Sequence, residues 1–148
     1  MEDEVRVPIN GDEDLVTARG EGRAMAERLG FPRPDPTLIA TAISEVARNI
    51  VVHAGRGAIV ITPFEDRDRY GLVVTATDQG AGIRDLEAAL RDDISGRGGL
   101  GLGLPGARRL MDDFEVTSDA ESGTKVTMRK WRFHDELARR REERRRRA

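Results

Sequence analysis

The stretch Gly96-Arg97-Gly98-Gly99-Leu100-Gly101-Leu102-Gly103-Leu104 decides the fold when it is read with Asp78-Gln79-Gly80-Ala81-Gly82, which ends an apolar run upstream. Successive glycines leave their backbone N–H groups unhindered, and such groups can form a cradle for an anion. Leucines alternate with glycines here, which is not typical of a flexible linker. The sequence therefore predicts a phosphate-binding segment, followed by a helix over 105–111 whose N-terminus attracts anions.

The glycine-rich segment does not match the two commonest nucleotide-binding motifs. No Gly-Lys-Ser or Gly-Lys-Thr follows the glycines, as a Walker loop requires. The segment also does not follow a first strand, as a dinucleotide-binding fingerprint does. A different kind of nucleotide site is therefore expected.

Asp78 stands at the end of a predicted strand, and Gly80 and Gly82 follow it closely. A carboxylate in that position can meet a ligand because the glycine backbone allows close approach. It could accept a hydrogen bond from an exocyclic amine such as that of adenine. Read alone, Asp78 is equally well a turn aspartate before glycine.

Glu45 and Asn49 are four residues apart on a predicted helix, so they share one helix face. A carboxylate there can accept a proton from a hydroxyl group or water. An amide oxygen one turn later is a suitable ligand for Mg²⁺, which keeps most of its coordination for water and phosphate. Read alone, this spacing is also that of an ordinary solvated helix face.

The order of the predicted elements indicates the fold class. It is a two-layer α/β (α+β) sandwich, with a mixed, largely antiparallel sheet and helices on one face. The elements are a strand over 5–9, helices over 12–29 and 36–53, strands over 58–64 and 70–77, helices over 86–90 and 105–111, strands over 114–118 and 125–129, and a polar helix over 131–147.

Composition narrows the functional classes. The 148 residues suit one domain, and they include no cysteine and only two histidines, so a thiolate or histidine metal site is not expected. No apolar run approaches the roughly 20 residues that span a bilayer, and the acidic N-terminus is not a signal peptide. We therefore expect a cytoplasmic protein without a membrane partner.

The charges are distributed unevenly along the chain. Residues 1–133 carry 18 basic against 23 acidic residues, a net charge of −5, whereas residues 134–148 carry seven arginines against four acids, a net charge of +3. Duplex nucleic acid usually binds a basic face of the folded body. Because the body here is acidic, no nucleic-acid partner is expected.

In order and spacing, these motifs resemble those of the GHKL ATPase superfamily, which has the Bergerat fold. Residues 44–49 resemble its N box, residues 78–82 its first G box, residues 98–103 its second, and Gly123-Thr124 its last. The likeness indicates an ATPase or kinase domain over 1–133 and an Arg-rich extension over 134–148. Within the superfamily, residues 41–50 and 101–112 are most similar to RsbT-like serine/threonine kinases of stressosome and partner-switching modules.

The resemblance implies a reaction and a set of roles. ATP and Mg²⁺ would serve transfer of the γ-phosphate to a serine or threonine of STAS-domain proteins (RsbS- or RsbR-like) in a bacterial stress response. Once released, the kinase would activate a downstream PP2C-type phosphatase. Glu45 would be the general base and Asn49 the Mg²⁺ ligand. The other residues carried over as ATP-binding are Asp78, Gly80, Gly82, Gly98, Gly99, Leu100, Gly101, Leu102, Gly103 and Thr124.

Two other interpretations stay open at this point. The chain could be an ATP-binding anti-sigma factor that sequesters a sigma factor and phosphorylates an anti-anti-sigma factor. It could also be a nucleotide-sensing regulator without transfer activity. The presence of both Glu45 and Asn49 counts against this third interpretation. The N box residues Ala47-Arg48-Asn49-Ile50, together with the run over 104–111, favour the stressosome type. A homodimer is consistent with the superfamily, although the sequence does not compel it.

Overall fold

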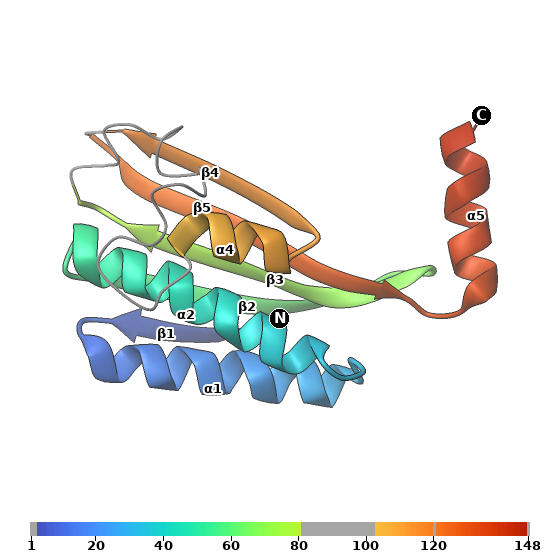
Figure 1. Ribbon diagram of the computed structural model, residues 1–148, viewed down its shortest axis with the longest axis horizontal. Helices are drawn as coiled ribbons and strands as arrows, with labels where there is room; N and C mark the ends of the chain where they lie inside the picture. Colours follow the sequence, from blue (N-terminus) through green and yellow to red (C-terminus); the bar gives the residue numbers. More distant parts are fainter. Residues whose placement is uncertain (1–2, 81–102, 120, 148) are drawn as a thin grey trace.

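A single five-stranded sheet organises the chain in the computed structural model, which describes residues 3–80, 103–119 and 121–147 (Figure 1). Its strands lie in the order β1-β2-β3-β5-β4, and all four pairings between them are antiparallel. The sheet was predicted as mixed and largely antiparallel, but its described strands are antiparallel throughout and include no parallel pair. The strands are β1 (Val5–Ile9), β2 (Gly57–Glu65), β3 (Arg69–Asp78), β4 (Asp113–Asp119) and β5 (Gly123–Phe133).

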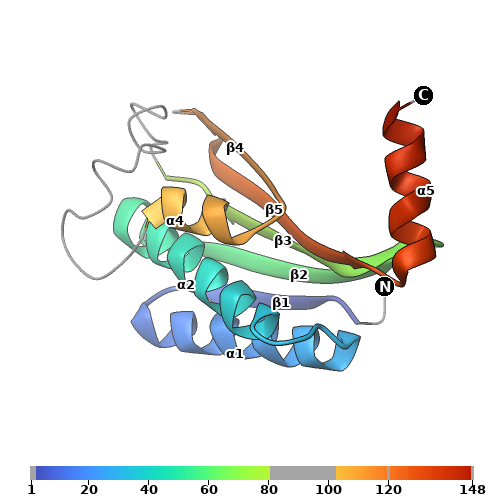
Figure 2. The same ribbon diagram turned by 45° about the vertical axis from the view of Figure 1, so that its right-hand side comes forward.

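Three helices cover one face of this sheet: α1 (Asp12–Leu29), α2 (Asp35–His53) and α4 (Gly103–Leu110) (Figure 2). No helix of the described residues covers the opposite face. A further helix, α5 (Glu136–Arg147), stands apart at the end of the sheet where β2 turns into β3. The arrangement confirms the predicted two-layer sandwich with helices on one face.

The core lies between the sheet and these helices. The spacing of buried residues along the strands and along the helices places their apolar side chains on the facing surfaces. Along β3, Leu72, Val74 and Ala76 are buried while the residues between them are half-buried, which is the two-residue period of a strand with one covered face. The α2 residues predicted as a core stripe are all buried: Ile39, Ile43, Val46 and Ile50.

The predicted C-terminal helix begins too early. The structure continues β5 through Phe133, and α5 begins only at Glu136, so the helix start predicted at Trp131 is wrong. The long β3 strand offers backbone partners over this whole length, with Trp131 opposite Gly71. Aromatic residues also favour strands. Asp135 then begins the helix, because its Oδ1 accepts the N–H of Ala138 at 2.8 Å.

The other predicted bounds agree with the structure to within two residues, apart from the longer β5. The short helix predicted over 86–90 lies outside the described residues. Among the described ranges, no helix is long and apolar enough to cross a membrane.

Candidate nucleotide site

Asp78 ends β3 as a buried carboxylate, with a relative exposure of 6%. Its Oδ1 accepts the backbone N–H of Gly80 at 2.9 Å and that of Thr124 at 3.3 Å. The register places Thr124 of β5 directly opposite Asp78. Two residues predicted from separate motifs, one from the first G box and one from the last, are therefore neighbours. The Oδ2 oxygen is not used by these two bonds.

A second hydroxyl group joins this cluster, and sequence reasoning missed it. The side chains of Ser118 and Thr124 are hydrogen-bonded to each other, with 2.8 Å between Oγ and Oγ1. Thr124 is buried, with a relative exposure of 5%. Ser118 lies opposite Thr124 in the β4–β5 pairing. The hairpin predicted around Ser122 and Gly123 could have identified this pair, because the strand register on either side of its turn places Ser118 opposite Thr124.

Two glycines allow the backbone to approach Asp78 closely. A Cβ atom at Gly123 would lie 2.2 Å from the carbonyl oxygen of Asp78, and its φ of +80° is the left-handed conformation that favours glycine. A Cβ at Gly80 would lie 2.7 Å from the Cβ of Ala54, just after α2. The end of β3 therefore lies tightly between the β4–β5 turn and the end of α2.

The β4–β5 turn is held by its own aspartate. Asp119 Oδ1 accepts the N–H groups of Glu121 and Ser122, at 2.8 and 2.6 Å, and Ser122 Oγ also donates to this carboxylate. The hydrogen bonds from Ser122 and Glu121 hold the pKa of Asp119 below its ordinary value. A turn fixed in this way positions Gly123 and Thr124 against Asp78.

The second part of the candidate site is on α2. Glu45 is buried there, with a relative exposure of 7%, and its Oε1 accepts the N–H of Gly103 at 2.7 Å. Gly103 is the first residue of α4, so the carboxylate lies at the positive end of that helix and satisfies one of its free N–H groups. The structure thus joins the predicted general base to the last glycine of the predicted phosphate segment.

The helix α4 is held at both of its ends. Glu45 bonds to its first residue, and Lys130 of β5 donates from Nζ to the carbonyl oxygen of Leu110, its last residue, at 2.9 Å. Leu104 and Ala107 between them are buried against the core. The N-terminus of α4 is therefore fixed relative to α2 and to the sheet.

The remaining predicted residues divide into those placed and those not described. Asn49 is half-buried on α2, one turn after Glu45. Gly80 follows β3 and contacts the end of α2. The others lie outside the described residues: Gly82, Gly98, Gly99, Leu100, Gly101 and Leu102.

A hollow of about 940 Å³ opens at the end of the sheet beside Asp78. Its described lining includes Asp78, Gly123 and Thr124, together with Arg56 just before β2 and Lys125 of β5. Glu45, Asn49 and Gly103 are not among its described lining residues. The predicted site residues therefore form two groups, one at this hollow and one at the start of α4, and α2 connects them.

This geometry agrees with what is found in known proteins. Residues 10–130 match the family of histidine kinase-like ATPase domains. The chain belongs to this family. The predicted likeness to GHKL ATPases is thereby confirmed, and the match includes every predicted site residue from Glu45 to Thr124.

Two kinds of bacterial protein are similar to this chain over much of its length. The serine/threonine-protein kinase RsbT of Bacillus subtilis is 47% identical over 131 residues, which cover 88% of this chain and 98% of that kinase. The anti-sigma F factor of Clostridium acetobutylicum is 32% identical over 108 residues, which cover 65% of this chain and 73% of that protein. The predicted likeness to RsbT is therefore confirmed at high coverage.

Among solved structures, the catalytic domain of the histidine kinase ThkA aligns with 84% of this chain and with 94% of its own length. The TM-score is 0.46 and the sequence identity is 15%.

Proposed function

We propose that this chain is an ATP-dependent protein serine/threonine kinase of the partner-switching type. It acts in the cytoplasm on STAS-domain proteins and, once released from them, activates a downstream phosphatase. The observation that carries the proposal is the bond between Glu45 and Gly103, because it joins a carboxylate to the N-terminus of a helix suited to phosphate. The 47% identity to the kinase RsbT supports the same function.

The spacing of the two groups along α2 supports a bound nucleotide. Ala54, which contacts Gly80, follows Glu45 by nine residues. At 1.5 Å per residue, this is about 14 Å along the helix axis, comparable to the length of an extended nucleoside triphosphate. We infer that the base lies at the Asp78 end and the phosphates at the α4 end.

The Asp78 end suits an adenine base. Asp78 Oδ1 is occupied by two backbone N–H groups, which leaves Oδ2 to accept from the exocyclic amine. Thr124, held by Ser118, offers a hydroxyl group beside it. A buried acceptor of this kind discriminates strongly between ligands, since a ligand without the matching donor leaves it unpaired.

The Glu45 end suits transfer of the phosphoryl group. Oε1 of Glu45 is anchored by Gly103, so Oε2 is the oxygen that takes the proton of the attacking serine or threonine hydroxyl group. The new bond forms between that hydroxyl oxygen and the γ-phosphorus. The bond from the γ-phosphorus to the bridging oxygen breaks, and ADP leaves.

Asn49 fits the role of a Mg²⁺ ligand. It is half-buried one turn after Glu45, and its amide oxygen is a hard donor. When bound, Mg²⁺ neutralises charge on the phosphates. This ion is commonly held by one or two protein ligands plus phosphate and water. The chain contributes the remaining stabilisation through the N–H groups at the start of α4.

The experiment uses the whole 148-residue chain, Mg²⁺, γ-labelled ATP and STAS-domain proteins encoded near it. The wild type is expected to place label on serine or threonine. Glu45→Gln keeps an oxygen that can accept the Gly103 N–H but removes the base, so transfer should fall about 10²- to 10⁴-fold while ATP affinity is retained. Glu45→Ala should lose both the transfer and the anchor of α4. Transfer at the wild-type rate in Glu45→Gln would sink the base role.

The Mg²⁺ ligand is tested separately with Asn49→Ala and Asn49→Asp. Alanine removes the oxygen ligand and should abolish the Mg²⁺-dependent part of ATP binding, whereas aspartate keeps an oxygen and should retain part of it. Binding is measured by calorimetry with and without Mg²⁺. Unaltered Mg²⁺ dependence in Asn49→Ala would count against the ligand role.

The second candidate is an ATP-binding anti-sigma factor, favoured by the 32% identity to an anti-sigma F factor. In that case the chain binds a sigma factor stably in the presence of ATP and phosphorylates its anti-anti-sigma factor. Co-purification with candidate sigma factors separates the two functions. Stable capture of a sigma factor, without transfer to stressosome STAS proteins, would replace the leading proposal.

A further inference from the structure

The helix α5 is an element that the proposed kinase reaction does not use. It lies beyond residues 10–130, which match the ATPase family. It stands at the end of the sheet opposite Asp78, away from α1, α2 and α4 (Figure 1). The predicted Arg-rich extension therefore forms an ordered helix, and its attachment indicates what it presents.

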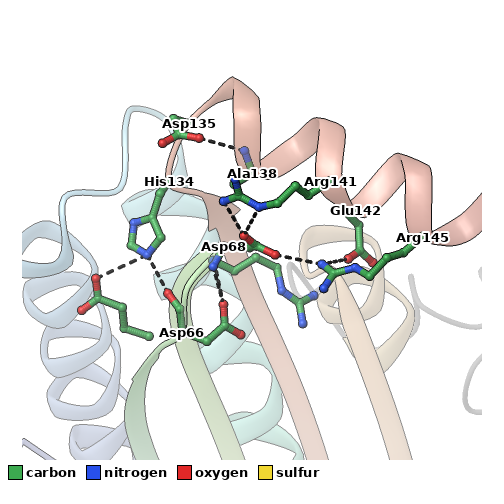
Figure 3. Close-up of polar contacts among 10 residues, drawn as sticks. Asp66, Asp68, His134, Asp135, Ala138, Arg141, Glu142 and Arg145 are labelled. Carbon is green, nitrogen blue, oxygen red and sulfur yellow. Dashed lines mark hydrogen bonds and ion pairs between the residues drawn. The ribbon is translucent and has the colours of Figure 1, made fainter.

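One buried carboxylate holds α5 to the body. Figure 3 shows Asp68, from the turn between β2 and β3, between two arginines of α5. Asp68 Oδ1 accepts from Arg141 Nε and Nη2 at 2.9 and 2.6 Å, and Oδ2 accepts from Arg145 Nη2 at 2.8 Å. Charge-assisted bonds of this kind are about twice as strong as neutral ones. We name Asp68, Arg141 and Arg145 the α5 latch.

A second attachment fixes the start of the helix. His134 Nε2 lies 3.0 Å from the carbonyl oxygen of Asp66 and 3.3 Å from the carboxylate of Glu65 (Figure 3). Its ring lies 5.5 Å from that of Tyr70, which in turn lies 5.3 Å from that of Phe31. With contacts at its start and along one face, α5 has a defined orientation on the body.

The face of α5 that the latch leaves outward is an arginine stripe. Arg140, Arg144 and Arg147 are exposed and spaced four and three residues apart, which places them on one helix face. Arg140 lies 3.5 Å from Glu136, whereas the side chains of Arg144 and Arg147 form no ion pair or hydrogen bond with another described residue. Leu137 beside the stripe is 63% exposed. We name these three arginines the α5 stripe.

Helix-end electrostatics account for only part of this arrangement. Arginines in the last turn stabilise the negative end of any helix. That effect needs no buried aspartate, and it does not require the helix to be held against the sheet. The α5 latch uses two arginines to orient the helix, and the α5 stripe keeps three others directed to solvent.

We propose that the α5 stripe is a docking surface for an acidic patch on the protein substrate of this kinase. The identity of the partner rests on the proposed function, but the chemistry of the surface does not. Seven arginines against four acids give residues 134–148 a net charge of +3, while the body carries −5. The phosphate backbone of a long nucleic acid would also lie along the acidic body and be repelled by it. A local acidic patch on a folded protein can instead contact the stripe alone.

The test compares the wild-type chain of 148 residues with the stripe variant R140E/R144E/R147E. The matched control is R19E/R23E/R28E, which makes the same charge change at three exposed arginines of α1. The probe is a STAS-domain partner whose acceptor serine is replaced by alanine, so that binding is read without transfer. Rim charges act mainly on association, so the association rate constant should fall about tenfold in the stripe variant and little in the control.

Ionic strength gives a second measurement on the same samples. At 1 M salt the screening length is about 3 Å, so the difference between wild type and stripe variant should vanish. ATP affinity should be equal in all three proteins, because the stripe is far from Asp78 and Glu45. Equal association rates for the stripe variant and wild type would overturn the docking surface, as would an equal loss in the control.

The outcomes separate the docking surface from the kinase proposal. Stripe-dependent binding of the partner without any transfer from labelled ATP keeps the docking surface and overturns the kinase. If the wild type transfers label but the stripe variant binds the partner as well as the wild type does, the kinase proposal stands and the docking surface is overturned. A chain that neither binds nor labels the partner counts against both. Stripe-dependent binding of duplex RNA in place of the partner would overturn the acidic-protein occupant.

Discussion

Two aspartates at opposite ends of β3 are buried to a similar extent but have different partners. Asp68 precedes the strand and Asp78 ends it, and their relative exposures are 7% and 6%. Both oxygens of Asp68 are bound by the guanidinium groups of Arg141 and Arg145. The two described bonds of Asp78 come from backbone N–H groups and both go to Oδ1.

The difference teaches what a buried carboxylate at a strand end can do. An anion whose two oxygens are both bound by cations serves a structural role, because three of its roughly four acceptor sites are used and its charge is already paired. An anion held on one oxygen by rigid backbone donors is fixed in place and still offers an acceptor. In this chain the first kind fixes a helix and the second suits a ligand.

The largest expected effect is the loss of ATP affinity in Asp78→Asn. The amide keeps one acceptor oxygen but loses the charge. Its NH₂ group would face either the two backbone N–H groups now bound to Oδ1 or the exocyclic amine of the base, and these groups are all donors. Hydrogen bonds to a charged group contribute about 1.5–3 kcal/mol each, so we expect ATP affinity to fall about 100-fold or more. Calorimetry with ATP measures it, and the α5 latch should be unaffected.

Asp68→Asn is the reciprocal control for that measurement. It removes the same charge from a site of similar burial at the other end of β3, so ATP affinity should stay within twofold of the wild type. Equal losses of affinity in the two variants would mean that the ends are not independent.

The nucleotide end was largely predictable because its chemistry is local in sequence. Asp78 and Gly80 belong to one short motif, and Glu45 and Asn49 to one helix turn. The position of Ser118 follows from the hairpin register, once the turn at 119–123 is known. The direct bond from Glu45 to Gly103 was not predictable, since 58 residues separate them and only the packing of α4 on α2 brings them together.

The attachment of α5 to Asp68, at the other end of β3, was not predictable either, because its partners are also far apart in the sequence. Asp68 stands in a charged turn, and its partners are 73 and 77 residues later in a segment that contains seven arginines. Which arginines face inward depends on where α5 begins. The helix was predicted from Trp131, whereas pairing of β5 with β3 delays it to Glu136. A shift of this size changes which side chains face the turn.

Thr124→Val and Ser118→Ala test which hydroxyl group beside Asp78 contributes to ATP binding. Valine replaces the Thr124 hydroxyl with a methyl group of similar size and leaves Ser118 without that partner. A neutral hydrogen bond contributes about 0.5–1.5 kcal/mol, so we expect a roughly fivefold loss of ATP affinity for valine and a smaller one for Ser118→Ala. If Ser118→Ala weakened binding more than Thr124→Val, Ser118 itself would be the ligand contact.

Asp68→Asn also tests the far end directly. Losing the charge of the α5 latch should free α5 from the β2–β3 turn, since a neutral amide binds two guanidinium groups poorly. Trypsin cleavage within α5 should become several-fold faster, because locally opened helices are cut first. Asp119→Asn is the matched control, as it alters a turn aspartate at the other end of the sheet. Unchanged cleavage in Asp68→Asn would show that His134 and Tyr70 hold the helix without the latch.

The smallest expected effect is on the titration of Asp68. Hydrogen bonds from Arg141 and then Arg145 hold the pKa of Asp68 below the ordinary aspartate value of about 3.9. A carboxyl whose folded pKa is depressed contributes stability above its unfolded pKa and loses it as the pH falls through the folded one. The α5 latch should therefore persist from neutral pH to about pH 4 and open only below it.

Salt distinguishes this titration from that of Asp119, whose pKa is also lowered. The partners of Asp68 are charged, whereas those of Asp119 are the neutral N–H and O–H groups of Ser122 and Glu121. Because salt screens ion pairs far more than neutral hydrogen bonds, raising the salt to 1 M should move the Asp68 midpoint toward 3.9 and leave Asp119 nearly unchanged. Carboxyl carbon shifts measured by NMR follow both residues in one sample. Equal salt shifts at the two sites would mean that the guanidinium groups do not hold Asp68 in solution.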